Sequence, residues 1–329
     1  MKGALSSPRW MLKRVQHDDL SESLDTDRPA VQRPLTGIAL RLLTALLLAT
    51  MFACVKLAAN RGVNLIETLF YRQIGSVLCA IGMVAAGPGF ASLRSRRVGA
   101  HVVRMGLGMT AMALNFLAMI MLPLAEATAI GFTVPIFSVI LAAILLAEPT
   151  GKWRWGAVAA GFLGVLVIVQ PGKGDVPLLG AGIAVVAALI TASVTIMIRR
   201  LGATERASTT VFWFAASSLV PLAVLMVWFA QAHDVATWGV LAIVALAGGL
   251  AQLTLTGALR LAPVALVMPM DYTSLLWATL LGAWLFAELP TPWTWVGAPI
   301  IITGGLVIVW REHRRHRRAA LAGDMALPD

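Results

Sequence analysis

The stretch LAAILLAE at residues 141–148 returns 140 residues further along the chain as LGAWLFAE at 281–288. Five of the eight positions are identical, and Glu148 matches Glu288. The same offset aligns GVLVIV at 164–169 with GGLVIV at 304–309, and no gap is needed across nearly fifty residues. Chance similarity between apolar segments seldom extends so far, so the sequence indicates an internal repeat of long period.

The composition around this repeat is typical of a membrane protein. Of the 329 residues, 59% are hydrophobic and 13% are charged, whereas soluble domains have roughly 45–50% and about 25%. This composition excludes an ordinary soluble enzyme, and it argues against a nucleic-acid binder despite the net charge of +10. Cys54 and Cys79 both lie within apolar runs, so they do not indicate a disulfide framework.

Ten segments are long and apolar enough to be membrane-spanning helices, which need about 20 residues each. They are expected near residues 37–58, 65–87, 101–121, 124–147, 155–171, 178–198, 208–230, 236–259, 262–287 and 294–310. The expected fold class is therefore an all-α polytopic membrane protein. Its parts are an N-terminal tail (1–36), a first repeat of five spans (37–172), a second repeat of five spans (173–311) and a basic C-terminal tail (312–329).

An odd number of spans per repeat predicts that the second copy enters the membrane from the opposite side. The loops agree: EPTGKWRW at 148–155 carries two basic residues, whereas its counterpart ELPTPWTW at 288–295 carries none. With both termini cytoplasmic, 22 of the 26 Lys and Arg residues, Arg41 and Arg104 among them, fall on the inner side. This bias predicts an inner-membrane protein and assigns the run REHRRHRR at 311–318 to topology rather than to nucleic acid or anionic lipid.

The sequence resembles the drug/metabolite transporter superfamily, EamA type. The resemblance rests on LAEATAIGFTVPIFSVILAAILLAE at 124–148, on its second copy LAPVALVMPMDYTSLLWATLLGAWLFAE at 261–288, and on LFYRQ at 69–73. It implies ten helices arranged as two inverted five-helix repeats around a central cavity, with spans 5 and 10 at the periphery. The DYTSLLW stretch at 271–277 further resembles permeases for metabolites such as S-adenosylmethionine or riboflavin.

Two charged residues are expected near the middle of the membrane, where an ionisable side chain is expensive and is by default a functional hypothesis. Arg72 lies eight residues after Asn64, which at 1.5 Å per residue is roughly 12 Å from the outer boundary. Asp271 lies at a similar depth from the other side. We expect them to face one cavity, where they either pair together or bind opposite charges of a substrate. The alternatives are a purely structural ion pair and an arginine that snorkels to the headgroups.

Further residues are weaker candidates. Tyr272, Trp277 and Asn115 are expected to line the cavity, although packing between helices is the commoner role of such side chains. Lys56 is expected either to bind substrate or to snorkel. Glu126 is expected either to carry a coupled proton, a role for which Asp271 is the other candidate, or to complement a helix N-terminus. Glu148 and Glu288 are expected to hold the turns at the ends of spans 4 and 9.

Prolines and small residues within the spans predict how the helices bend and pack. Pro135 and Pro269 lie inside spans 4 and 9, and we expect each to interrupt its helix. Closely spaced small residues in GAVAAGFLG at 156–164 and at Gly304 and Gly305 predict that spans 5 and 10 pack tightly, within one chain or in a homodimer.

The leading functional hypothesis is a secondary carrier that moves a small metabolite, charged or zwitterionic, by alternating access. The lack of a GxxxxGK[ST] motif argues against ATP-driven pumping by this chain. An intramembrane enzyme is disfavoured, because all five histidines fall in loops, tails or a span end, and no HExxH or GxSxG motif occurs. A non-transporting scaffold or sensor is the other alternative. We expect no cofactor, no metal and no nucleic-acid partner. The expected partners are the lipid bilayer and the substrate.

Overall fold

The computed structural model describes residues 33–87, 89–95, 97–145, 152–171, 176–202, 207–262 and 264–324, and within them all regular structure is helical. The elements are α2 (Pro34–Asn60), α3 (Leu65–Ala85), η1 (Phe90–Leu93), α4 (Val98–Met121), α5 (Leu124–Gly131), α6 (Val134–Leu145), α7 (Lys152–Val169), α8 (Leu178–Gly202), α9 (Ala207–Phe229), α10 (Val235–Leu261), α11 (Val264–Val267), η2 (Met268–Thr273), α12 (Ser274–Phe286) and α13 (Pro292–Asp324). The predicted all-α class is confirmed for this part of the chain.

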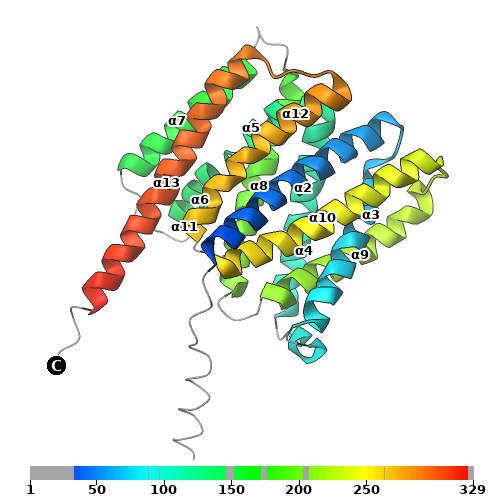
Figure 1. Ribbon diagram of the computed structural model, residues 1–329, viewed down its shortest axis with the longest axis horizontal. Helices are drawn as coiled ribbons and strands as arrows, with labels where there is room; N and C mark the ends of the chain where they lie inside the picture. Colours follow the sequence, from blue (N-terminus) through cyan, green and yellow to red (C-terminus); the bar gives the residue numbers. More distant parts are fainter. Residues whose placement is uncertain are drawn as a thin grey trace, which may run out of the picture.

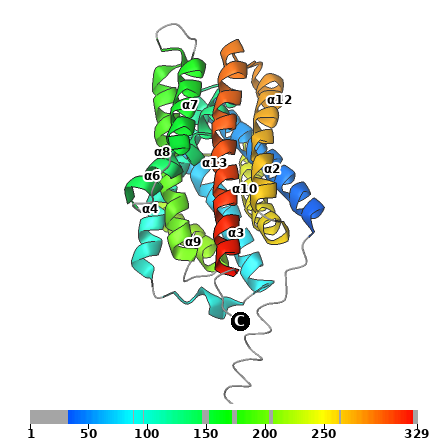
Figure 2. The ribbon, with the colours of Figure 1, turned by 90° about the vertical axis from the view of Figure 1, so that its left-hand side faces the viewer.

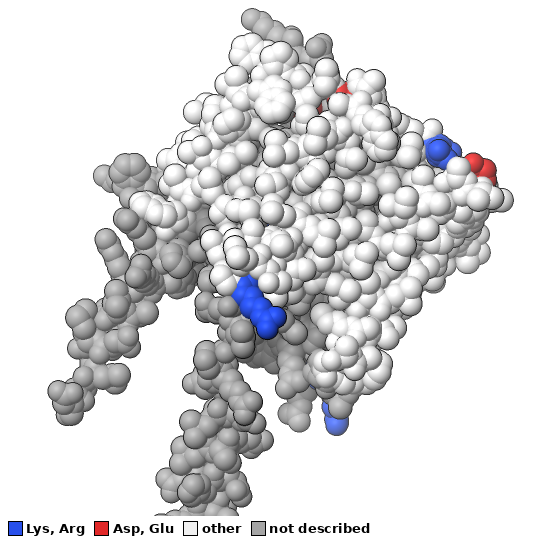
Figure 3. Space-filling view, in the orientation of Figure 1, with Lys and Arg blue, Asp and Glu red and all other residues white. Residues whose placement is uncertain are grey.

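Seven helical segments of the described chain are long and apolar enough to cross a membrane, with α5 and α6 counted together as one of them. Two shorter apolar helices, Trp155–Val169 and Pro292–Ile308, belong to α7 and α13. The face in Figure 3 is almost entirely uncharged, and its few Lys, Arg, Asp and Glu residues lie near the upper and lower edges. The chain is therefore a multi-pass membrane protein, because only lipid makes such a surface favourable.

The two spans that contain Pro135 and Pro269 are interrupted, as the sequence predicts, whereas Pro221 and Pro299 lie inside the continuous helices α9 and α13. The first is divided into α5 and α6 at Phe132 and Thr133, just before Pro135, and the second passes through η2 before α12 begins. Proline cannot donate a backbone hydrogen bond, so the helix loses its regular pattern there. At this interruption the hydroxyl of Thr133 donates to the carbonyl of Ile130 at 2.7 Å, beside the bond from the backbone N–H of Thr133 to the same carbonyl at 3.0 Å.

Polar side chains cap the N-termini of two of the long helices. Asn64 accepts a hydrogen bond from the backbone N–H of Ile66 at the start of α3. Asp234 accepts one from the N–H of Thr237 at the start of α10. Bonds from Thr237 hold the pKa of the exposed Asp234 below its usual range. These caps satisfy backbone donors that have no partner within the helix.

Successive long helices run back and forth across the bundle, as Figures 1 and 2 show. We call the side where α2 begins and α13 ends the tail face, and the opposite side, where Gly62 joins α2 to α3, the far face. Helix α2 packs on α10, and α4 packs on α8. The pair α7 and α13 lies at one edge of the bundle in Figure 1, and the pair α3 and α9 lies at the other edge.

Small residues bring α7 and α13 into close contact, as predicted, and they do so within one chain. A Cβ added to Gly297 would lie 2.5 Å from the carbonyl oxygen of Gly164. One added to Gly304 would lie 3.1 Å from the carbonyl oxygen of Ala157. Both distances are shorter than ordinary van der Waals contact, so these glycines are what allow the two backbones to approach.

Candidate functional site

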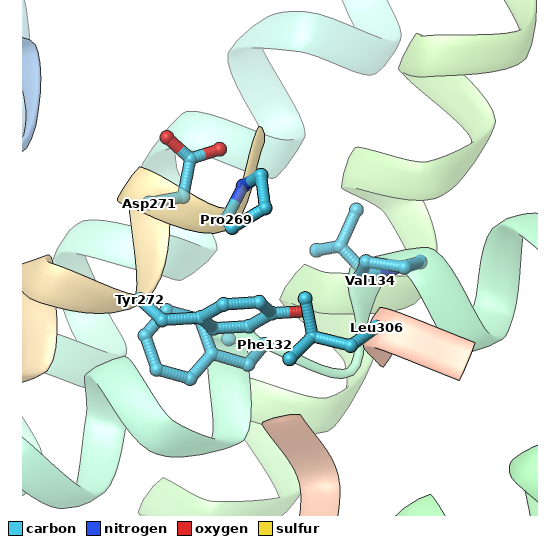
Figure 4. Close-up of a pocket in the computed structure, with 8 residues that line it drawn as sticks. Phe132, Val134, Pro269, Asp271, Tyr272 and Leu306 are labelled. Carbon is cyan, nitrogen blue, oxygen red and sulfur yellow. The ribbon is translucent and has the colours of Figure 1, made fainter. Parts of the chain in front are cut away.

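The interruptions of the two spans that contain Pro135 and Pro269 meet inside the protein and enclose a cavity (Figure 4). The rings of Phe132 and Tyr272 lie edge to face with their centroids 4.9 Å apart. The cavity beside them has a volume of about 190 Å³. Its lining residues come from both interruptions and from α13, and they are Gly131, Phe132, Val134, Pro135, Pro269, Asp271, Tyr272 and Leu306. Asp271 is the one ionisable carboxyl group among them, and the other lining groups are mostly apolar.

Asp271 forms an ion pair with Arg41 of α2. The side chain of Arg41 is 10% exposed and that of Asp271 is 36% exposed. The expected pairing of Asp271 with Arg72 is therefore wrong. Arg72 instead donates to the side-chain oxygen of Gln73 at 2.7 Å. Sequence reasoning missed Arg41 because it was counted among the cytoplasmic topology charges, although its place within the apolar run 37–59 was the available signal.

A second buried ion pair joins Lys56 of α2 to Glu288, just beyond the end of α12. The ammonium of Lys56 donates to the two carboxylate oxygens at 2.7 and 2.6 Å and to the carbonyl of Leu122 at 2.8 Å. It also lies 5.3 Å from the centre of the Phe286 ring. Lys56 therefore does not snorkel in this structure. Because its three donors hold groups from separate elements, this lysine connects α2 to two loops at the far face.

Glu126, at the start of α5, is fully buried and binds the start of α13. Its Oε1 accepts a hydrogen bond from the backbone N–H of Thr291 at 2.9 Å and from the hydroxyl of Thr294 at 2.9 Å. Its Oε2 is buried with no hydrogen-bond partner among the described residues. The carboxyl group thus caps a helix other than its own, which spacing along the sequence does not reveal.

This arrangement predicts different outcomes for two replacements of Glu126. Glu126→Ala leaves the N–H of Thr291 without its acceptor, so we expect it to lower the free energy of unfolding by about 1–3 kcal/mol. Glu126→Gln keeps an acceptor oxygen at the same place and should cost much less. Denaturant titration in detergent micelles measures both values, and equal losses for the two variants would contradict the capping role.

The other predicted site residues are separate from the cavity. Asn115 of α4 donates to the carbonyl of Ala111 at 2.7 Å and to the hydroxyl of Thr191 at 3.2 Å, so it bridges α4 and α8. Trp277 is partly buried on α12 and does not line the cavity. Glu148 lies outside the described residues. Within the described part of the chain, no group of three or more His, Cys, Asp or Glu side chains is arranged to hold a metal ion.

Comparison with known proteins identifies the family. The model of the EamA-like transporter family matches residues 35–170 and again residues 178–310. The chain belongs to the EamA-like transporter family. The resemblance inferred from the repeated motifs is thereby confirmed, and transporters of this family are not enzymes. The double match also agrees with the repeat at an offset of 140 residues.

Several relatives have names that specify a transported molecule, and two of them are described here. A riboflavin transporter of Rhizobium johnstonii is 31% identical over 235 residues, which are 70% of this chain and 77% of the relative. The pseudopaline exporter CntI of Pseudomonas aeruginosa is 27% identical over 276 residues, covering 83% of this chain and 93% of the relative. A solved crystal structure with 20% identity covers 84% of this chain and 97% of its own, with a TM-score of 0.58. That likeness concerns the fold alone.

Proposed function

We propose that this protein is a secondary transporter that moves a small metabolite across the inner membrane by alternating access. The observation that carries the proposal is the cavity between two interrupted helices, with the Asp271–Arg41 ion pair at its wall. Interrupted helices near the membrane midplane are where secondary transporters build substrate sites, because freed backbone groups and charges can face a cavity there. The names of the relatives support a small-molecule substrate.

The finer architecture that we propose is ten membrane crossings in two inverted repeats. Contacts between residues at the repeat offset support it. Gly164 contacts Gly297, and Ala157 contacts Gly304. Gly304 is the counterpart of Gly164 at the offset of 140 residues, and Gly297 is the counterpart of Ala157, so the two contacts are equivalent under exchange of the repeats. Phe132 and Tyr272 are also counterparts, and they contact each other directly. A pseudo-two-fold axis through the cavity would produce both patterns. The excess of basic residues on one side supports cytoplasmic termini.

The present conformation is too closed for the substrate that the relatives' names suggest. A cavity of about 190 Å³ is below the roughly 300 Å³ at which ligand pockets usually begin. Ion pairs and hydrogen bonds close the far face at Lys56 and Glu126. We therefore propose that the helices around the cavity separate during transport, and that the paired interruptions are where they bend.

The predicted substrate contacts divide into two groups. Asp271 and Tyr272 line the cavity, and we assign them to substrate directly. Lys56 and Asn115 have protein partners, so we propose that they contact substrate only after those bonds open. We propose that Trp277 comes to line the cavity when the helices around it separate. Asp271 and Glu126 are the proposed sites for a coupled proton, since one carboxyl group lines the cavity and the other is fully buried, and burial favours the protonated form of a carboxyl group.

Flux into proteoliposomes tests this proposal. The panel comprises labelled amino acids, nucleosides and vitamins, measured with and without a pH gradient. We expect flux of at least one compound, reduced about tenfold or more by Asp271→Asn. The matched control is Asp234→Asn at the exposed start of α10, where asparagine caps a helix as well as aspartate does. Absence of flux for every compound, from protein that remains folded, would contradict the transport function, and flux that ignores the gradient would remove the coupled proton.

A further inference from the structure

Arg104 is a buried cation and Arg72 a partly buried one, and neither has a carboxylate partner among the described residues. The other two buried basic side chains each face a carboxylate, because Arg41 pairs with Asp271 and Lys56 with Glu288. The remaining buried carboxylates are also engaged, Glu67 with His233 and Glu126 with the start of α13. The interior between α3, α4 and α9 therefore carries two positive charges in excess.

The surroundings of Arg104 leave part of its guanidinium unsatisfied. Arg104 is 8% exposed, and its guanidinium lies 4.2 Å from the centre of the Phe214 ring of α9. Its Nε and Nη1 are buried without a hydrogen-bond partner. A ring face attracts a cation but accepts no strong hydrogen bond, so it does not replace an anion.

Arg72 is held in the same region by a polar chain. Its Nη1 donates to the side-chain oxygen of Gln73, and the amide of Gln73 donates to the hydroxyl of Ser218, which lies one turn after Phe214 on α9. Gln73 and Ser218 are both fully buried. The Nε of Arg72 is buried and unpartnered. Both arginines are linked to the same stretch of α9, Arg72 through Gln73 to Ser218 and Arg104 directly to Phe214.

Glycines make the room that both arginines occupy. A Cβ added to Gly248 of α10 would lie 3.3 Å from Cγ of Arg72 and 3.4 Å from its Nε. A Cβ added to Gly108 of α4 would lie 2.5 Å from Nη1 of Arg104 and 2.6 Å from the Phe214 ring. Any larger side chain at these two positions would displace the arginines. The protein therefore accommodates two unpaired cations at a cost in stability, which is typical of a functional site.

We infer that Arg72 and Arg104 together bind an oxyanion, the carboxylate or phosphate group of the transported solute. The inference rests on the proposed transport function and narrows its substrate to an anion or a zwitterion with an exposed acidic group. A guanidinium donates two parallel hydrogen bonds to a carboxylate or phosphate, and such bonds are strong where water is excluded. The unpartnered N–H groups of both side chains are the donors, and Phe214 forms an apolar wall beside them.

The first test measures stability without and with an anion. In detergent without phospholipid, we expect Arg72→Gln and Arg104→Gln each to raise the midpoint of thermal unfolding of the ligand-free protein by about 2–4 °C, because each removes one unpaired buried charge. Inorganic phosphate or succinate, compared with sodium chloride at equal ionic strength, should raise the midpoint of the wild type and of neither variant. Arg61→Gln at the exposed far-face loop is the matched control and should respond to phosphate as the wild type does.

Two opposite outcomes overturn the inference. Arginines that serve only the fold would make both variants less stable than the wild type, with the response to phosphate unchanged. A response confined to phosphatidylglycerol, added as a separate arm, would assign the site to a lipid headgroup rather than to a solute. If phosphate or succinate raises the unfolding midpoint of the wild type but of neither variant, the site binds the acidic group of a solute.

Flux measurements separate this inference from the proposed function. In proteoliposomes we expect acidic members of the panel to be carried, and Arg72→Gln or Arg104→Gln to reduce their flux about tenfold or more. Flux of neutral or cationic compounds alone, unaffected by the two variants, would refute the oxyanion site and leave the transport function standing. Absence of all flux would refute the transport function, while the thermal measurements would still report on anion binding.

Discussion

Replacing Lys56 by methionine is expected to lower the free energy of unfolding by about 3–5 kcal/mol, the usual loss when one partner of a buried ion pair is removed. The ammonium holds both oxygens of Glu288 and the carbonyl of Leu122. The lysine side chain is 6% exposed and the glutamate side chain 31% exposed. In Lys56→Met the partly exposed carboxylate of Glu288 and the carbonyl of Leu122 both lose their donor, so most of the loss is the cost of leaving these acceptors without a partner.

The double variant Lys56→Met/Glu288→Gln should recover a large part of this loss, because no charge is then left alone. Comparing the two single variants with the double variant isolates the energy of the pair itself. The measurement is unfolding in mixed micelles of increasing sodium dodecyl sulfate content. Arg61→Met, which removes an exposed cation of the same face, serves as control and should change little. A Lys56→Met protein as stable as this control would show that the pair is solvated and weak.

Replacing Gly75 by alanine is expected to lower the free energy of unfolding by about 3 kcal/mol, at the upper end of the range for overpacked cores. A Cβ at this position would overlap the backbone of α10, 2.5 Å from the carbonyl carbon and 2.9 Å from the Cα of Ala245. Gly249 of the same helix meets the carbonyl oxygen of Gly75 from the other side. The obstacle is backbone in both directions, so no side chain can turn aside to make room.

Gly82→Ala in the same helix is the matched control, since a Cβ there meets nothing within 4 Å. Alanine has the higher helix propensity, so this variant should be more stable by about 0.5–1 kcal/mol. The same unfolding titration compares the two variants, and flux shows whether the spacing of α3 and α10 also matters one turn away at Arg72. Similar stabilities for the two alanine variants would mean that α3 and α10 are not in backbone contact.

Much of the architecture is readable from local sequence. Membrane-spanning helices need a continuous apolar run, and proline removes a backbone donor, so the helices and the interruptions near Pro135 and Pro269 could be predicted. Pro221 and Pro299 lack the same donor, yet α9 and α13 are continuous, so local sequence does not say which proline interrupts its helix. The tight contact of α7 with α13 was also predictable, because small residues at close spacing leave few other ways to pack. The interrupted spans differ from the continuous helices expected at 124–147 and 262–287 only where Pro135 and Pro269 act.

The partners of the charged residues were not readable in this way. Depth along a helix can be counted from its end, and it predicts that Arg72 and Asp271 lie far from the span ends, but it does not say toward which neighbour a side chain turns. Asp271 meets Arg41, 230 positions away, and Glu126 caps α13, 165 positions away at Thr291. Arg104 was counted with the topology charges because arginine near a span end usually reaches the headgroups; its contact with Phe214 turns it inward instead.

The sequence by itself therefore determined that the chain lies in a membrane, that it contains a repeat, and which prolines could interrupt its helices, because those properties follow from apolar runs and backbone chemistry at each position. Only the tertiary structure decided which charges neutralise each other and which are left over. That outcome depends on the rotation and packing of helices far apart in the chain: α2 brings Arg41 and Lys56 to their carboxylates, while Arg72 and Arg104 converge where the described structure offers no acid to meet them.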